Sequence, residues 1–197
     1  MEPVRVVTGR AVPLDRSDVD TDQIIPSEWL KRVERTGFGR GLFSEWRDDR
    51  DFVLNDERHA GANVLLAGPN FGTGSSREHA VWAIQDYGFR AVISAQFADI
   101  FRNNATKCGL VPVQVDAEVA EALMEAVQGD PDLEITIDVE RGTVAAPAAG
   151  IEAPFDLDQS IRQRLVEGLD DIGLTLAHGK AIDAHEARRP DWLPTTA

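Results

Sequence analysis

Short apolar runs alternate with amphipathic stretches through the middle of the chain. The apolar runs span residues 63–67, 90–94 and 110–115, and each has the length of a buried strand. The amphipathic stretches that follow them predict helices at residues 76–87, 97–107 and 118–127, the first two of which are closed by glycines. Strands and helices that alternate at this spacing predict right-handed crossovers and a parallel sheet.

The pattern differs on either side of this region. Residues 4–14 predict the first strand, whereas residues 133–139 and 142–146 alternate apolar and polar positions around a turn and predict an antiparallel hairpin. An amphipathic helix at residues 159–167 and a charged helical tail at residues 177–197 complete the pattern. The sequence therefore predicts an α/β fold in a single domain of all 197 residues, with a parallel central sheet and a smaller antiparallel layer.

Residues 35–56 interrupt the regular pattern with three glycines and four aromatic residues. Just before them, Ser27 and Glu28 have the character of a helix start. The charge run from Glu45 to Asp51 is typical of a solvated face. We predict that residues 35–56 form a loop with short helical pieces, and that this loop is mobile when the chain is alone.

Charge and cysteine content exclude several classes of partner. The net charge of −14 makes nucleic acids and anionic membranes poor partners, although a local arginine can still attract a small anion. No run approaches the ~18 apolar residues of a membrane span. A single cysteine, Cys108, cannot form an intramolecular disulfide, and we expect a cytoplasmic protein. The four histidines lack metal-ligand spacing, so we predict no metal in this chain.

The most informative stretch is the glycine-rich loop between the first apolar run and its helix, because open α/β sheets bind ligands at this end of their strands. Gly72 and Gly74 allow backbone N–H groups to approach a ligand closely. Ser75 and Glu78 have the spacing of a capping box at the helix start. The helix N-terminus and the forked Arg77 guanidinium together favour an anion, and a carboxylate suits their geometry.

Simpler interpretations of this loop stay open. A capping box alone is usually structural, and a histidine placed like His79 is more often a structural residue than a catalytic one. The loop lacks the Gly-x-x-x-x-Gly-Lys-Ser/Thr pattern of a P-loop. It also lacks the flanking pattern of a Gly-x-Ser-x-Gly nucleophile elbow, which leaves a serine hydrolase of that type poorly supported.

Four blocks of sequence carry a family resemblance. Residues 70–80 (NFGTGSSREHA) resemble the active-site loop of the swivelling domain of the aconitase superfamily. Residues 20–26 (DTDQIIP) and 97–104 (FADIFRNN) are similar to blocks of the isopropylmalate dehydratase small subunits, and residues 167–176 (EGLDDIGLTL) resemble the ending of the bacterial ones. The chain is therefore identified as a member of that small-subunit family over nearly its whole length.

The resemblance implies a fold, a reaction and a partner. The fold is a three-layer β/β/α swivelling domain. The reaction is that of a hydro-lyase in leucine biosynthesis, which interconverts 2-isopropylmalate and 3-isopropylmalate through 2-isopropylmaleate. Activity requires a large subunit that supplies a [4Fe–4S] cluster, since such a cluster needs about three or four thiolates and this chain has one cysteine. This chain itself is expected to bind no cofactor.

The resemblance also implies roles for particular residues. Ser75 is the base that removes a proton from the dicarboxylate substrate, and it needs nearby N–H groups and a cation to be basic enough. The residues implied to bind substrate are Ser76, Arg77, Gly74, Thr73, Trp29 and Leu30. The residues implied to support the loop and its helix are Gly72, Glu78, Asp20 and Asp22. Trp29 and Leu30 would face the isopropyl group, and a plain core position for both is an equally good interpretation.

Three other functions stay open at this point. The chain could serve a related hydro-lyase with a homoaconitate or methylmalate-type substrate, which a substrate panel would distinguish. It could be a non-catalytic anion-binding module, although such a module has no need of Ser75 beyond capping. An independent serine hydrolase would work without a partner and would be labelled at Ser75 by a serine-directed reagent.

Overall fold

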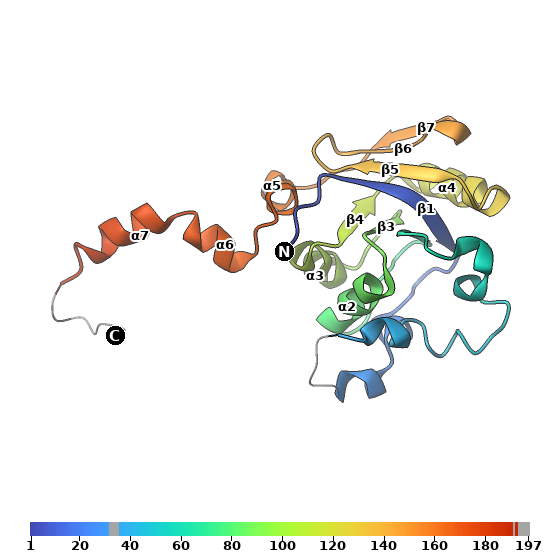
Figure 1. Cartoon of the computed structure of the whole chain (residues 1–197), viewed down its shortest axis with the longest axis horizontal. Helices are drawn as coiled ribbons and strands as arrows, with labels where there is room; N and C mark the ends of the chain where they lie inside the picture. The colour runs from blue at the N-terminus through green and yellow to red at the C-terminus, as the bar shows by residue number, and fades with distance from the viewer. Residues whose placement is uncertain (32–35, 191, 193–197) are drawn as a thin grey trace.

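The computed structural model describes residues 1–31, 36–190 and 192 (Figure 1). The end of the helix predicted after Ser27, the first residue of the predicted loop and most of the end of the predicted tail lie outside these ranges. Within them, no helix combines the length and the apolar character that a membrane crossing requires.

One curled seven-stranded sheet organises the body of the molecule, in the order β4-β3-β2-β1-β5-β6-β7. The strands are β1 (Val6–Leu14), β2 (Val64–Ala67), β3 (Ala91–Ser94), β4 (Val111–Gln114), β5 (Glu134–Asp138), β6 (Thr143–Ala146) and β7 (Ile151–Pro154). Strands β1 to β4 pair in parallel, whereas β5, β6 and β7 continue from β1 in antiparallel pairs. The predicted fold class and the predicted hairpin are confirmed, and β7 is a strand that the pattern did not reveal.

Strand β1 joins the two halves of the sheet. Its first part, from Val6 to Arg10, pairs with β5, and its second part, from Ala11 to Leu14, pairs with β2. Of the nine residues of β1, five pair with β5 and four pair with β2. The antiparallel strands therefore extend the parallel sheet through β1, and the curl of the sheet separates them into the smaller layer that the sequence predicts.

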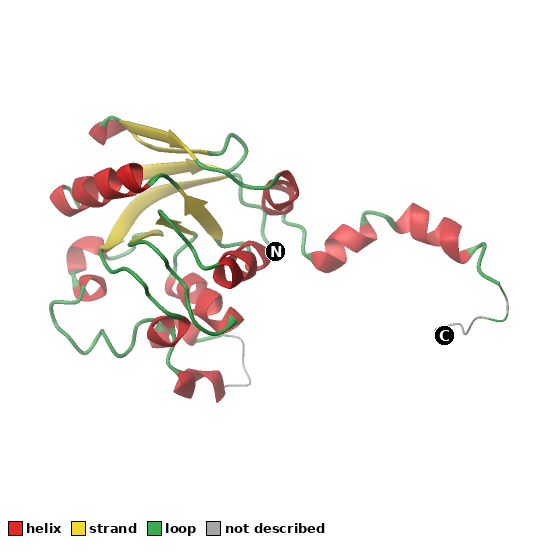
Figure 2. Ribbon diagram, turned by 180° about the vertical axis from the view of Figure 1, so that it is seen from behind, coloured by secondary structure: helices red, strands yellow, loops and turns green. Residues whose placement is uncertain are grey.

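The helices of the body cover both faces of the sheet, and two more helices follow at the C-terminal end (Figure 2). They are α1 (Thr21–Ile24), α2 (Glu78–Tyr87), α3 (Asp99–Cys108), α4 (Ala117–Gly129), α5 (Gln159–Glu167), α6 (Asp171–Leu176) and α7 (Gly179–Glu186). The short 3₁₀ helices are η1 (Ser27–Lys31), η2 (Phe38–Gly41), η3 (Val53–Asn55), η4 (Glu57–His59) and η5 (Pro147–Ala149). Gly88 and Gly109 end α2 and α3 with positive φ angles of 124° and 86°, as the sequence predicts.

Two hydrophobic cores lie on opposite faces of the sheet. In β2, Val64 and Leu66 pack into the core that contains α4, whereas Leu65 and Ala67 pack into the core that contains α2 and α3. Both faces of the strand are buried, which is why its sequence is a continuous apolar run and not an alternating one. The glycine-rich loop that follows β2 therefore begins at a residue whose position is fixed by packing on both faces of the strand.

The described part of the predicted loop 35–56 contributes to the second core. Phe38, Leu42, Phe43 and Phe52 are almost completely buried. Most of the charge run is exposed, in agreement with the expected solvated face. The aromatic side chains anchor the segment at several points, and its mobility in the isolated chain stays a prediction for the charged stretch between them.

The C-terminal helices α6 and α7 extend away from the body (Figures 1 and 2). They follow α5, which the body holds through the hydrogen bond from the Val4 N–H to the Leu165 carbonyl at 2.8 Å. Gly168 ends α5 in the left-handed conformation, and the chain leaves the body there. Within the predicted tail of residues 177–197, helix α7 lies in the part that the structure describes.

Candidate functional site

The glycine-rich loop connects the carboxyl end of β2 to α2. Gly72 and Gly74 have φ angles of 82° and 88°, and Asn70 also lies in the left-handed region with a φ of 61°. A Cβ atom on Gly72 would come within 2.3 Å of the Phe101 ring. Glycine at position 72 is therefore required both by the backbone conformation and by the close packing of α3.

Helix α1 and the residues before it hold this loop in place. The Thr21 N–H donates to the Thr73 carbonyl at 2.9 Å, and the Thr21 hydroxyl donates to the Ser75 carbonyl at 3.1 Å. The Gly72 N–H donates to the Val19 carbonyl at 2.7 Å. These contacts join segments about fifty residues apart in the chain, so the loop has a defined conformation without a ligand.

Asp20 and Gln23 form the capping box of the site region. The Asp20 carboxylate accepts from the Gln23 N–H at 2.8 Å, and the Gln23 side chain accepts from the Asp20 N–H at 2.9 Å. This pair fixes the start of α1, which in turn positions Thr21 against the loop. The predicted supporting role of Asp20 thus has a specific physical basis.

The capping box predicted at Ser75 and Glu78 is wrong. Helix α2 begins at Glu78, and its N-cap is Arg77, which has an extended backbone and makes no side-chain cap. The Ser75 carbonyl accepts bonds from Thr21 and from the Arg77 N–H, which keeps Ser75 outside the helix. Glu78 points elsewhere and accepts a hydrogen bond from the Cys108 thiol at 3.1 Å. The tertiary contacts of the loop override the local helix-start signal.

Ser75 and Ser76 are exposed just ahead of α2, next to Arg77. The side chain of Arg77 is mostly buried, with 21% exposed, and its Nη1 atom forms an ion pair with Asp22 of α1. Two hydroxyls and a partly buried guanidinium near the positive end of a helix form a site that can bind an anion. The structure thus brings together Ser75, Ser76 and Arg77, as expected from the sequence.

A small acidic hollow borders Asp22. It has a volume of about 220 Å³, and its lining includes Asp20, Asp22, Glu28 and Glu45. The carboxylates that line this hollow repel an incoming carboxylate. An anionic ligand is therefore favoured on the side of Arg77 and the two serines.

Trp29 and Leu30 lie in η1 and are half-buried. The Trp29 ring rests on Gly41, where an added Cβ would come within 2.5 Å of it. This contact belongs to the second core, so Trp29 packs in the interior with only part of its surface available. His79 makes ring contacts with Phe38 and Trp82 at centroid distances of 5.5 Å and 4.7 Å, in line with a structural residue.

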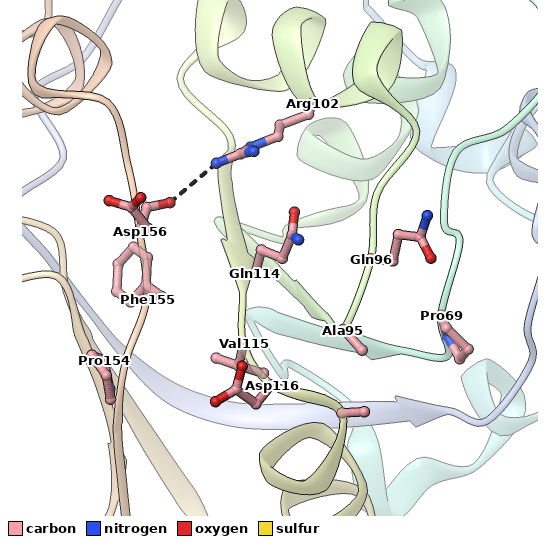
Figure 3. Close-up of a pocket in the computed structure, with 11 residues that line it drawn as sticks. Pro69, Ala95, Gln96, Arg102, Gln114, Val115, Asp116, Pro154, Phe155 and Asp156 are labelled. Carbon is pink, nitrogen blue, oxygen red and sulfur yellow. Dashed lines mark hydrogen bonds between the residues drawn. The ribbon is translucent and has the colours of Figure 1, made fainter.

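A larger cleft, of about 750 Å³, opens beyond the carboxyl ends of β3 and β4 (Figure 3). Gln96, Gln114 and Arg102 line it, and Arg102 donates to the Asp156 carbonyl at 3.1 Å (Figure 3). The residues after β7 reach this cleft because the sheet curls until its two edge strands approach each other. The sequence pattern does not reveal the cleft, since its walls come from segments whose proximity depends on that curl.

Metal-ligating side chains do not gather in the part of the chain that the structure describes. Among those residues, no group of three or more histidine, cysteine, aspartate or glutamate side chains could hold a metal ion. The cysteine of the chain, Cys108, is half-buried at the end of α3.

Comparison with known proteins adds a second line of observation. The family model described as the aconitase C-terminal domain matches residues 1–118, and a model described as the C-terminal domain of the 3-isopropylmalate dehydratase small subunit matches residues 171–197. The 3-isopropylmalate dehydratase small subunit of Parafrankia sp. (strain EAN1pec) is 66% identical over 197 residues, which cover 100% of both chains. That of Frankia alni is 65% identical over 195 residues, which cover 99% of both chains.

The chain belongs to the family of 3-isopropylmalate dehydratase small subunits. A solved family member, 3-isopropylmalate dehydratase (leuD) from Methanocaldococcus jannaschii, has the same fold with a TM-score of 0.67 and 26% identity. The alignment covers 92% of the present chain and 99% of that one. The resemblance stated from the sequence is confirmed, and the small-subunit family implies a large-subunit partner.

Proposed function

We propose that the chain is the small subunit of 3-isopropylmalate dehydratase, a hydro-lyase of leucine biosynthesis, and that Ser75 removes the substrate proton. The observation that supports this most directly is the exposed Ser75-Ser76-Arg77 group on a loop that α1 holds in place, in a chain of this family. The overall reaction interconverts 2-isopropylmalate and 3-isopropylmalate through 2-isopropylmaleate.

Ser75 needs its surroundings in order to act as a base. The proton to be removed is on a carbon beside a carboxylate and is barely acidic, and a serine hydroxyl is a poor base near neutral pH. The N-terminal end of α2 and the Arg77 guanidinium stabilise negative charge on the Ser75 oxygen. Exposure of Ser75 in the isolated chain means that the site becomes dry only when another surface covers it, which strengthens these interactions.

Ser76 and Arg77 bind and orient a carboxylate of the substrate in this proposal. Arg77 uses its Nη1 atom for Asp22, and a guanidinium carries further N–H donors in the same plane. A plane that is held by Asp22 can present those donors in a fixed direction. Thr73 and Gly74 adjoin the two serines in this proposal, and the backbone of Thr73 is held in place by its hydrogen bonds with Val19 and Thr21.

The active site is incomplete without a large subunit. We propose that this partner carries a [4Fe–4S] cluster, which supplies Lewis-acid assistance to the departing hydroxyl group when bound. The present chain has one cysteine and therefore too few thiolates to hold such a cluster by itself. A single cysteine, which can form no intramolecular disulfide, also agrees with a reducing cytoplasm, where we propose that the assembled enzyme works.

The substrate is a small branched dicarboxylate. The partly exposed surface of Trp29 and Leu30 offers an apolar contact for the isopropyl group in this proposal. An apolar pocket discriminates by only about 1–3 kcal/mol per methylene. Activity toward smaller methylmalate-type acids is therefore expected alongside the main substrate.

Reconstitution tests the proposal. The chain is co-expressed with a cluster-bearing large subunit and kept anaerobic, and ultraviolet absorbance follows formation of the unsaturated intermediate from 2-isopropylmalate. Turnover that requires both chains is the expected result. A pair that assembles but is inert toward 2-isopropylmalate and active on homoaconitate would contradict the substrate, and activity of the small chain alone would contradict the division of labour.

A further inference from the structure

The C-terminal tail exposes an unusual amount of apolar surface. Among the described residues, six large apolar side chains are exposed, and four of them lie in or just beyond α6 and α7. Those four are Ile172, Leu176, Ile182 and Trp192, with exposed fractions of 69%, 71%, 37% and 79%. The body of the chain, which is several times longer, contributes Val6 and Ile100.

Ile172 and Leu176 form an apolar pair on one face of α6. They are four positions apart, which places them one above the other along the helix. The tail extends away from the body, so the described part of this chain leaves the pair exposed (Figure 1). An ion pair between Arg164 and Asp171 at 2.9 Å links the body to the very start of α6.

Helices of this length need a packing surface. Helix α6 has six residues and α7 has eight, whereas isolated helices shorter than ~12–15 residues are marginal in water. Hydrogen bonds of the tail run within the tail itself, such as those from the Leu174 N–H to the Asp170 carbonyl and from the Ile182 N–H to the His178 carbonyl. Two short helices with an uncovered apolar face are therefore stable only when another surface packs against them.

Charge argues against a second copy of this chain as that surface. Each copy carries a net charge of −14, so two copies repel each other before their apolar groups can meet. The tail also matches a family model of its own, residues 171–197, whose description names the small subunit and not the aconitase domain in general. The tail is thus a feature of the separate small subunit, which must hold a partner without a covalent connection.

We infer that α6 and α7 dock on the large subunit and fasten the two chains together, with Ile172 and Leu176 at the centre of the contact. The inference rests on the proposed function because it takes the large subunit as the partner. It assigns the tail to assembly and leaves the chemistry to the loop around Ser75. The docked tail keeps the loop close to the other half of the active site without contributing to proton transfer.

The test compares a tail variant with a matched surface variant in the full-length chain. Ile172→Gln/Leu176→Gln removes the apolar pair but keeps good helix-forming residues. Val6→Thr removes another exposed apolar side chain, with 54% of Val6 exposed, and keeps its β-branched shape. The dissociation constant of each variant with the large subunit is measured by sedimentation, and kcat is measured with the chain in excess.

The expected result is a dissociation constant at least about tenfold higher for the tail variant, an unchanged value for Val6→Thr, and an unchanged kcat at saturation for both. Hydrogen exchange should show α6 and α7 unprotected in the free chain and protected in the complex. An unchanged dissociation constant for the tail variant would overturn the inference.

Self-association would overturn it as well, if the free chain forms a dimer that the tail variant cannot form. The dissociation constant from sedimentation does not depend on whether the complex turns over substrate. A failure of the proposed reaction and a failure of the docking inference therefore give different results.

Discussion

The site loop and the C-terminal tail are held in opposite ways. The loop depends on groups far away in the chain, since Thr21 donates a hydrogen bond to the carbonyl of Ser75, which is 54 residues away. The hydrogen bonds of α6 and α7 join residues three or four apart. The loop is therefore organised by the fold before any ligand arrives, whereas the tail is organised locally and needs a surface to pack on.

The two kinds of anchoring suit two different parts of the function. Preorganised groups are the ones that can stabilise a developing charge at little cost when the reaction occurs. A weakly anchored pair of short helices is suited to association, where the ordering occurs on binding. Substitutions in the loop should consequently change turnover or substrate binding, and substitutions in the tail should change assembly.

The largest effect is expected for Ser75→Ala. Loss of a general base lowers kcat by about 10²–10⁴-fold, and assembly should be unchanged because Thr21 bonds the Ser75 carbonyl and not its hydroxyl. Steady-state kinetics of the reconstituted enzyme give kcat, and sedimentation gives assembly. Ser160→Ala serves as a control, since it removes another exposed hydroxyl at the start of α5. Near-normal turnover by Ser75→Ala would remove Ser75 from the role.

The next effect concerns the ion pair between Asp22 and Arg77. Asp22→Ala should raise KM for 2-isopropylmalate by about 10–100-fold, because a hydrogen bond to a charged group contributes about 1.5–3 kcal/mol and its loss leaves the guanidinium without a fixed direction. Asp22→Asn should recover most of the loss, since its amide oxygen still accepts from Arg77. A lower KM in either variant would mean that Asp22 competes with the substrate and does not position Arg77.

A smaller effect is expected at Trp29. Trp29→Ala should reduce the preference for 2-isopropylmalate over a methylmalate-type acid by about tenfold, if the exposed part of the ring contacts the isopropyl group. The ratio of kcat/KM for the two substrates measures this preference. The melting temperature of the variant should also fall, because the ring packs on Gly41. A lower melting temperature with equal losses on both substrates would assign Trp29 to the core alone.

Local patterns predicted the repeating part of the fold well. The continuous apolar run of β2 identified a strand with both faces buried, and Gly109 marked the end of α3. These features depend on neighbours within a few residues. The curl of the sheet, the strand β7 and the large cleft beside Arg102 depend on how distant segments meet, and no spacing in one sequence reports that.

The candidate site shows the same limit. The glycines and the Ser75-Ser76-Arg77 group were visible in the sequence, but Ser76 and Arg77 were assigned to the predicted helix 76–87 and in fact precede α2. The helix start was wrong because a Ser-x-x-Glu spacing describes only local preference, whereas the hydrogen bonds from Thr21 and Arg77 to the Ser75 carbonyl hold that residue outside the helix. The role of Thr21 itself was missed, since its partners lie about fifty residues away.

The smallest effect is expected at Asp56, in a segment whose contacts are partly local, like those of the tail, and partly tied to the body, like those of the site loop. Asp56 begins the short helix η4, and its carboxylate accepts hydrogen bonds from the side chain and the backbone N–H of Arg58. The contact is local, like those of the tail, yet the adjoining Leu54 and His59 are buried in the body. The side-chain bond from Arg58, followed by the backbone bond, lowers the pKa of Asp56 from 3.8 to about 2.

Because the pKa of Asp56 is depressed in the folded chain, the contact stabilises the fold above the usual pKa of an aspartate. That contribution is lost as the pH falls from about 4 to about 2. A carboxyl titration by nuclear magnetic resonance should give the low pKa in the native chain and a higher pKa in Arg58→Gln, which keeps the backbone hydrogen bond but loses the bonds from the guanidinium. Activity should not change, since the pair belongs neither to the glycine-rich loop nor to α1 and contributes little to the stability of the fold. An ordinary pKa for Asp56 in the native chain would mean that the contact between Asp56 and Arg58 opens in solution, even though the Arg10 guanidinium holds the Arg58 and Ala60 carbonyls from about fifty residues away.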